Sequence, residues 1–441
     1  MIDSSQYSYY LTYALLCGGL GVTYIKMKSM EGLTITTKEF KNFQNTFLVG
    51  YSLMILGELL ANASFYHSLV SLRLTLQQIT QLYIVSIIST TAAGVLIEIV
   101  DIGTRKDKCM ASAFLLGVSM FSFFFGGHYE MLMVGRVVYG TGSAFLHSSF
   151  DAYLIHEHTS LGFPDEWLTQ TLSLLTHSMS LVAVISGTVG QISGSVDPLG
   201  CPGVSCCVFL CAGCYIGTVW PKDMNGPRFM LSGFVFNMTQ AAKTIRSNRN
   251  VFQLVMISAL CESAISIFTY YWAPWITSVL IEESRTVPYE IVFATYISAS
   301  MLGNYGYQLL VPVWGNDTVL QMILVGSSGA YFLGGVFQTA SMVFMISIFV
   351  QGGVGAYWPS VGFLRGRYVR PELRGTFITI AKVGTLLISV TVLSLIHHSP
   401  MLTLLSCAIL FGGASYLQNS MIVTDSDSIE NYKNRDTDEE N

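Results

Sequence analysis

The sequence predicts an all-α polytopic membrane protein that crosses a lipid bilayer many times. Of its 441 residues, 51% are hydrophobic and only 11% are charged, whereas soluble domains carry about 25% charged residues. Apolar runs of about 20 residues, the length that crosses a bilayer as a helix, recur along the chain. The nine cysteines lie mostly inside these runs, which argues against a disulfide-stabilised fold.

Thirteen apolar runs are long enough to span the membrane. They cover residues 8–25, 43–63, 79–100, 109–127, 131–156, 168–192, 203–220, 251–280, 289–312, 319–338, 340–362, 376–396 and 401–418. A polar stretch separates the first run from the second, so we expect one extra N-terminal helix before a core of twelve helices.

The spans and the segments between them divide the chain into five expected regions. These are an extra helix with a basic linker at 1–42, a six-helix bundle at 43–220, a central loop at 221–250, a second six-helix bundle at 251–418 and an acidic disordered tail at 419–441. The end of the loop, residues 239–250, is basic and is expected to form a short helix at the membrane interface.

The positive charges predict the orientation of the chain. Nearly all of the 22 Lys and Arg residues lie between spans on one side of the membrane, and the other side holds only Arg73 and Arg285. Such an excess marks the cytoplasmic side. We therefore expect an extracytoplasmic N-terminus and a cytoplasmic C-terminus, in the plasma membrane.

Four ionisable side chains inside the predicted spans are candidates for function, because each costs several kcal/mol unless it is paired or hydrated. Glu58 and Arg136 lie at similar distances from the predicted outer ends of their spans, so an ion pair between them is expected. Such a pair serves either to position the helices or to take part in transport. Glu262 and Lys382 lie in later spans and either line a cavity or pack structurally.

The stretch from Gly135 to Trp167 is the most distinctive in the chain. Arg136 is followed by Gly140 and Gly142, which allow close packing of helices. This Arg-x-x-x-Gly-x-Gly pattern resembles the fourth helix of major facilitator superfamily transporters. The residues after it, Phe150-Asp151-Ala152-Tyr153 and Phe163-Pro164-Asp165-Glu166-Trp167, resemble the molybdate-anion transporter branch of that superfamily.

Other short motifs extend the resemblance over residues 43–396. The loop from Asp101 to Arg105 and Lys106 is similar to the superfamily's Asp-x-x-Gly-Arg-Lys loop, with Thr104 at the glycine position. Prolines in two later helices, Pro274 and Pro359, lie in segments similar to helices 7 and 10 of the branch. These residues, with Gly140, Gly142 and Asp151, are expected to serve gating or structural roles. The chain differs from the branch at positions that the resemblance implies bind substrate. Thr379 and Lys382 stand where helix 11 of the branch has an Asn and an Arg.

The resemblance implies a major facilitator fold and secondary active transport, by alternating access, of a small oxyanion such as molybdate. Anions bind to cations and hydrogen-bond donors, and the substrate-binding candidates are Arg136, Lys382, Glu262, Glu58, Tyr153 and Thr379. A dianion that enters against 100 mV faces a cost of about 4.6 kcal/mol, at about 2.3 kcal/mol per charge. Uptake therefore needs a co-transported cation, and a proton is the candidate partner.

Two other functions stay open at this point. The same fold could carry another solute, such as a sugar or an organic anion, or the protein could be a transport-inactive scaffold or receptor. The sequence has no phosphate-binding loop, catalytic triad or zinc signature, so an enzyme, a cofactor and a nucleic-acid partner are not expected. A metal site at His156-Glu157-His158 is also not expected, because residues two apart on a helix point to different sides.

Overall fold

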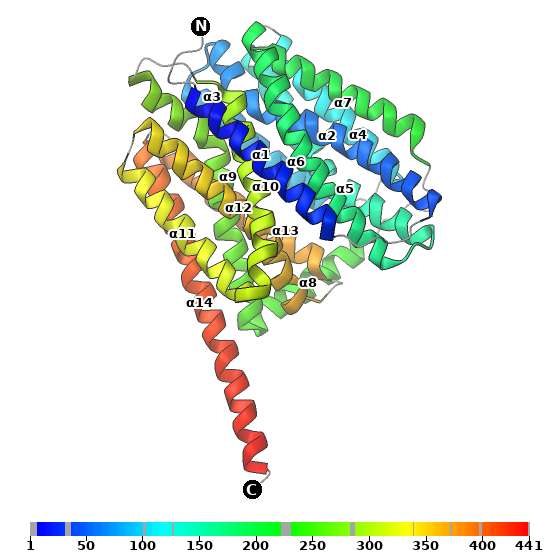
Figure 1. Ribbon diagram of the computed structural model, residues 1–441, viewed down its shortest axis with the longest axis vertical. Helices are drawn as coiled ribbons and strands as arrows, with labels where there is room; N and C mark the ends of the chain where they lie inside the picture. Colours follow the sequence, from blue (N-terminus) through cyan, green and yellow to red (C-terminus); the bar gives the residue numbers. More distant parts are fainter. Residues whose placement is uncertain are drawn as a thin grey trace. The chain divides into compact units, whose positions relative to one another are not determined.

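A computed structural model describes residues 7–30, 37–99, 103–125, 128–221, 231–282, 287–337, 339–370, 373–396 and 399–439. All regular secondary structure within these ranges is helical (Figure 1). The helices are α1 (Tyr7–Met30), α2 (Lys38–Ser71), α3 (Leu76–Ile99), α4 (Arg105–Phe121), the short 3-10 helix η1 (Ser122–Phe124), α5 (Tyr129–Ser160), α6 (Asp165–Val196), α7 (Gly200–Val219), α8 (Leu231–Ser247), α9 (Arg249–Glu282), α10 (Tyr289–Trp314), α11 (Asn316–Val336), α12 (Ala340–Tyr368), α13 (Arg374–Ile396) and α14 (Pro400–Glu439).

Each predicted span overlaps one of these helices, and most of the predicted ends lie within a few residues of the observed ones. Ten helices in the described ranges are apolar and long enough to cross a membrane. The prediction of an all-helical, multi-pass membrane protein is therefore confirmed. The predicted basic interfacial helix corresponds to α8, which begins at Leu231.

Several helices end later than the sequence predicted, and the difference is largest for α2 and α14. The second span was expected to end at residue 63, but α2 continues to Ser71. The backbone of α14 is helical to Glu439, through the stretch for which the acidic composition had predicted disorder. No Gly or Pro follows Gly413 in the sequence, so no residue type that commonly ends a helix interrupts α14.

The chain forms two compact units. Unit 1 comprises Met1–Phe234 and Ala273–Leu302, and unit 2 comprises Val235–Trp272 and Gly303–Asn441. Consequently α9 and α10 each contribute one part to unit 1 and another part to unit 2, and the first turn of α8 belongs to unit 1 while the rest of α8 belongs to unit 2. The division into bundles at 43–220 and 251–418 stays a prediction.

Glycines and aromatic rings hold the helices of unit 1 close together. A Cβ atom at Gly57 of α2 would lie 2.8 Å from the Phe209 ring of α7. At one end of the unit, the Trp220 ring stacks on the rings of Tyr153 and Phe47, with centroids 4.4 and 5.3 Å away. The extra helix α1 packs on α6, where the Tyr13 hydroxyl donates to the Val184 carbonyl at 2.6 Å.

Unit 2 uses the same kind of packing. A Cβ atom at Gly303 of α10 would lie within bonding distance of the Gly352 carbonyl oxygen of α12, so the two backbones are in direct contact. The Tyr307 hydroxyl donates to Asn316 Oδ1 at 2.8 Å, and the Ser360 hydroxyl donates to the same oxygen at 2.9 Å. These contacts fix α12 beside the start of α11.

Candidate functional site

An ion pair joins α9 to α12 inside unit 2. The Arg365 Nη2 atom lies 2.7 Å from Glu262 Oε1, and the two side chains are only 15% and 10% exposed. The same nitrogen lies 3.4 Å from the Ser258 hydroxyl. Charges this well covered need such pairing, because leaving either one alone would cost several kcal/mol.

A hydrogen-bond donor of Arg365 and a second cation near the pair are available to a negatively charged ligand. The Arg365 Nε donor is buried and has no hydrogen-bond partner within the described residues. Lys382 on α13 is exposed and acts electrostatically on the Glu262 carboxylate. Two cations and one carboxylate leave this group, which we call the cation cluster (Glu262, Arg365 and Lys382), with a net charge of +1 when all three are ionised.

The structure gives Glu262 a partner that the sequence did not single out. Arg365 lies just beyond the predicted span 340–362, so it was not among the candidates. However, α12 continues to Tyr368, so Arg365 lies in its last helical turns and reaches Glu262. The signal was present in the sequence, because Arg365 closely follows Pro359, in the segment that resembles helix 10 of the branch. Thr379 is buried on α13, three residues before Lys382.

A second acidic group lies on α2 and α5 in unit 1. Glu58 Oε1 is 3.1 Å from His147 Nε2, and the His147 side chain is 54% exposed. Asp151 lies one helical turn after His147 and is also exposed. We call Glu58, His147 and Asp151 the acid–histidine group.

The predicted ion pair between Glu58 and Arg136 is wrong. Glu58 pairs with His147, whereas the Arg136 guanidinium is buried among the rings of Phe65, Tyr139 and Phe123, at 4.1, 4.9 and 5.4 Å from their centroids. The prediction failed because it placed Glu58 too close to the outer end of its helix. Because α2 runs on to Ser71, Glu58 lies about two turns deeper than the predicted helix end implied.

Tyr153, another substrate-binding candidate, belongs to the packed core of unit 1. Its ring is 2% exposed and stacks against Trp220 at 4.4 Å between centroids, with an angle of 20° between the ring planes. Such stacking stabilises the end of the unit. A direct substrate contact for Tyr153 stays a prediction.

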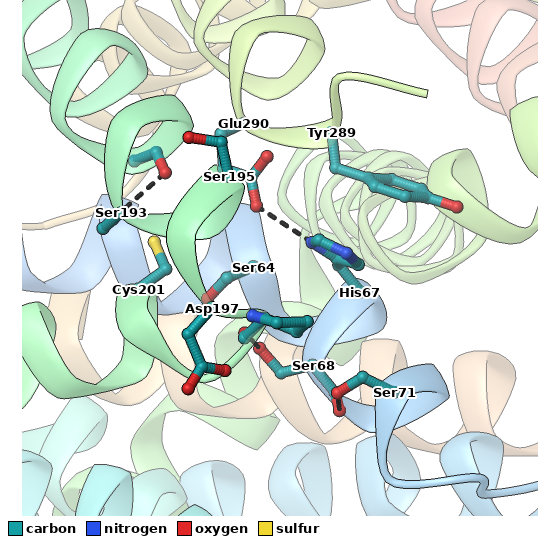
Figure 2. Close-up of polar contacts among 12 residues, drawn as sticks. Ser64, His67, Ser68, Ser71, Ser193, Ser195, Asp197, Cys201, Tyr289 and Glu290 are labelled. Atoms are coloured by element: carbon teal, nitrogen blue, oxygen red, sulfur yellow. Dashed lines mark hydrogen bonds and ion pairs between the residues drawn. The ribbon is translucent and has the colours of Figure 1, made fainter. Parts of the chain in front are cut away.

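Sequence reasoning did not identify a buried ion pair in unit 1. His67, near the end of α2, lies 3.3 Å from Glu290 at the start of α10, and the Glu290 side chain is only 3% exposed. Figure 2 shows the His67 ring hydrogen-bonded to this carboxylate and lying beside Tyr289. The two rings stack with centroids 5.2 Å apart.

Two glycines of α6 make room for Glu290. A Cβ atom at Gly190 would lie 3.2 Å from the Glu290 side chain, and one at Gly194 would lie 2.8 Å from its Oε1 atom. This Gly-x-x-x-Gly spacing puts both residues on one face of α6. The His67–Glu290 pair therefore joins the ends of α2 and α6 to the first turn of α10.

With this geometry described, comparison with known proteins identifies the family. A family model described as sugar transporters with twelve transmembrane segments matches residues 7–353, which is most of the chain. The chain belongs to this family. It is a branch of the major facilitator superfamily, as the motifs had indicated.

Curated relatives of this major facilitator protein are named molybdate-anion transporters. The Takifugu rubripes protein is 23% identical over 410 residues, which cover 82% of this chain and 81% of the relative. The Danio rerio protein is 24% identical over 425 residues, which cover 85% of this chain and 84% of the relative.

Solved structures confirm the major facilitator fold. The nucleoside transporter NupG is 11% identical and superposes with a TM-score of 0.67, over 87% of this chain and 98% of NupG. The E. coli fucose:proton symporter FucP is 13% identical, with a TM-score of 0.56 over 87% of this chain and 99% of FucP. At such low identity these similarities show the fold alone.

The structure gives physical roles to several motif residues of this family member. Thr104, at the usual glycine position, accepts from the Asp107 amide and forms a capping box that starts α4 just before Arg105. The Lys106 ammonium donates to the carbonyls of Gly217 and Trp220, at 3.0 and 2.5 Å, and so caps the end of α7. Asp101 lies outside the described residues.

Pro274 and Pro359 each lie inside a helix, in α9 and α12 respectively. A proline has no N–H group for the carbonyl four residues earlier, so each position weakens the helix locally. This is the structural basis for the gating role that the resemblance implied. That role stays a prediction for both residues.

Gly140→Ala is expected to destabilise the protein by about 1–3 kcal/mol through overpacking. The added Cβ would lie 2.7 Å from the Ser86 carbonyl oxygen and 2.8 Å from the Thr90 amide nitrogen, and these backbone atoms of α3 cannot move aside singly. At Gly142 the tightest contact, at 2.9 Å, is to the side chain of Leu116, so Gly142→Ala should cost less.

The thermal unfolding temperature of the purified protein measures this effect. Gly94→Ala is the matched control on α3, because a Cβ there would meet no atom within 4 Å. If Gly140→Ala and Gly94→Ala unfold at the same temperature, the close contact between α3 and α5 does not limit stability.

Proposed function

We propose that this protein is a secondary active transporter that moves a small oxyanion of the molybdate class across the plasma membrane by alternating access. The names of its relatives and its major facilitator fold support transport. The N-terminus is proposed to be extracytoplasmic and the C-terminus cytoplasmic, from the distribution of Lys and Arg.

The cation cluster is the observation that carries the choice of an anion. In the proposed site, a tetrahedral oxyanion accepts hydrogen bonds from Arg365 and Lys382, and the unpaired Arg365 Nε supplies a buried donor. Glu262 holds Arg365 in the empty site and competes with the incoming anion for it. The guanidinium offers a planar pair of donors and the ammonium a point charge, a combination suited to an anion with several oxygens.

A second candidate solute follows from the description of the family as sugar transporters. A neutral sugar needs hydrogen-bond donors and acceptors but no net positive charge, so the cation cluster favours an anion. A transport-inactive scaffold would need no binding cluster inside its spans, whereas a receptor would bind the anion without moving it. Both are outcomes of the experiment below.

The acid–histidine group is the proposed carrier of a co-transported proton. His147 is the side chain type that exchanges a proton near neutral pH, and it lies 3.1 Å from Glu58 on a neighbouring helix. An ionisable group this exposed within a span avoids the bilayer and faces water. One proton per turnover would offset about 2.3 kcal/mol of the electrical cost at 100 mV.

The His67–Glu290 pair is the proposed latch at the extracytoplasmic end. Alternating access requires contacts that form when this end is closed and break when it opens. The pair meets this requirement, because it joins α2 and α6 to the start of α10, a helix that continues into unit 2.

Uptake of labelled molybdate by the purified protein in proteoliposomes tests the proposal. We expect saturable uptake that tungstate inhibits strongly, sulfate less and a neutral sugar not at all. Transport of a sugar without molybdate transport would favour the second solute class. Binding without any uptake would favour a receptor. The absence of both binding and uptake would favour a scaffold.

His147→Gln is expected to lower uptake driven by an inward proton gradient by at least about tenfold, a loss of about 1.4 kcal/mol of coupling. Exchange of internal for external molybdate, which needs no net proton movement, should be retained. His128→Gln is the matched control, because His128 is an exposed histidine of the same unit, at the N-cap of α5. Unchanged gradient dependence in His147→Gln would contradict the proton role.

A further inference from the structure

A basic hollow lies where α8 meets α9 and α13 in unit 2. Its volume is about 640 Å³, and its lining includes Ala242, Ile245, Arg246, Arg249, Phe252 and Ile380. Two arginines and several apolar side chains therefore border one space, and none of the lining residues that the structure describes is acidic. None of these residues belongs to the cation cluster, the acid–histidine group or the His67–Glu290 pair.

The junction between the two helices holds Arg249 in place. The Asn248 side chain accepts from the amides of Asn250 and Val251, at 3.0 and 3.3 Å, and so caps α9 directly after α8 ends. Arg249 is thereby fixed at the first position of α9, where it donates to the Ser420 hydroxyl at 3.1 Å. Arg246 has no ion-pair or hydrogen-bond partner in the described part of the chain.

The apolar part of the hollow points to a ligand with hydrocarbon chains. Phe252 is about half exposed beside the arginines, and Ile245 and Ile380 are partly exposed on the helices that flank it. Farther along α8, Val235 and Phe236 are also exposed. A helix with this mixture of apolar and basic residues is typical of the membrane interface, where headgroups meet acyl chains.

We propose that this hollow binds one anionic glycerophospholipid of the cytoplasmic leaflet. Its phosphate group lies between Arg246 and Arg249, and its acyl chains run along Phe252 and Ile380. Charge complementarity selects an anionic headgroup, because two cations face the space and no acidic side chain is found among the described residues that line it. The cytoplasmic leaflet carries the anionic lipids of a plasma membrane, and the distribution of Lys and Arg assigns α8 to that side. The proposal does not depend on the identity of the transported solute.

Native mass spectrometry of the full-length protein tests this site by titration with phosphatidylserine, or with phosphatidylcholine of the same acyl chains. We expect one tightly retained phosphatidylserine molecule and weaker retention of phosphatidylcholine. Arg246→Ala and Arg249→Ala should each weaken phosphatidylserine binding about fivefold, corresponding to about 1 kcal/mol per charge near the surface. Thermal unfolding without added lipid shows whether each variant is folded.

Lys243→Ala is the matched control, because Lys243 is an exposed cation of α8 that does not line the hollow. An equal loss of binding in this variant would replace the site with diffuse surface attraction and overturn the proposal. Equal retention of phosphatidylcholine would do the same. Competition by inorganic phosphate or soluble glycerophosphoserine at the same concentration as the lipid would instead indicate a small-anion site without acyl-chain contacts.

Discussion

Lys382→Met is expected to reduce oxyanion uptake to background. Lys382 contributes one of the two positive charges in the cation cluster, and without it Glu262 neutralises Arg365 and leaves no net charge for the anion. A hydrogen bond to a charged group contributes about 1.5–3 kcal/mol, which corresponds to about a 10- to 150-fold loss in binding. Lys382→Arg keeps the charge and should preserve uptake.

The Glu262–Arg365 ion pair of the cluster is tested with variants that remove one charge or both. Arg365→Met alone leaves the Glu262 carboxylate buried without its partner. This loss destabilises a protein by about 3–5 kcal/mol for a fully buried pair, and we expect somewhat less here. The double variant Glu262→Gln/Arg365→Met removes both charges and should fold, but it should not transport. Glu262→Gln alone frees Arg365 and should bind the anion more tightly while releasing it more slowly.

Uptake in proteoliposomes, corrected for the amount of inserted protein, measures these effects. Lys243→Met, an exposed lysine of the same unit, is the control for a general loss of positive charge. Normal molybdate uptake by correctly inserted Lys382→Met would remove Lys382 from the site. Normal uptake by the Glu262→Gln/Arg365→Met protein would remove the whole cluster.

Glu290→Gln is expected to accelerate the labelling of Cys201 by a membrane-impermeant maleimide by about tenfold or more. Cys201, at the start of α7, is fully buried, and its thiol lies 3.4 Å from the Leu60 carbonyl oxygen. It therefore reacts only when this end of unit 1 opens. Breaking a buried pair costs about 3–5 kcal/mol, and we expect less here because His67 is 30% exposed.

The labelling is measured in a protein whose other eight cysteines are replaced, since the chain has nine. His67→Phe removes the ion pair but keeps a ring that can stack on Tyr289, and it should also label faster. Glu130→Gln, in the first turn of α5, is the control for loss of an acid elsewhere in the unit. Labelling at the parent rate in both Glu290→Gln and His67→Phe would show that the pair does not act as a latch.

The features that depend on local sequence could be predicted. Hydropathy located the spans, and the small residues Gly140 and Gly142 marked a surface where backbones approach, because both signals come from residues close together in the chain. Glycine at position 140 is now explained by the Ser86 and Thr90 backbone atoms that it faces.

The pairing of charges could not be predicted, because it depends on the depth at which each helix ends. An error of eight residues at the end of α2 moved Glu58 from the level of Arg136 to that of His147. Likewise α12 ends at Tyr368, six residues beyond the predicted span, and this difference places Arg365 inside the helix as the partner of Glu262. The His67–Glu290 pair was missed because Glu290 was taken as the edge of a span.

The passage of α9 and α10 between the two units has a mechanical consequence. The chain changes unit inside each helix, after Trp272 and after Leu302, and not in a connecting loop. Any movement between the units must therefore bend α9 and α10. In α9 the bend is least costly at Pro274, which has no N–H to offer the Tyr270 carbonyl, so no backbone hydrogen bond need break there. If transport proceeds by alternating access as proposed, the bending stiffness of these helices, more than the length of any linker, sets how fast the units can move.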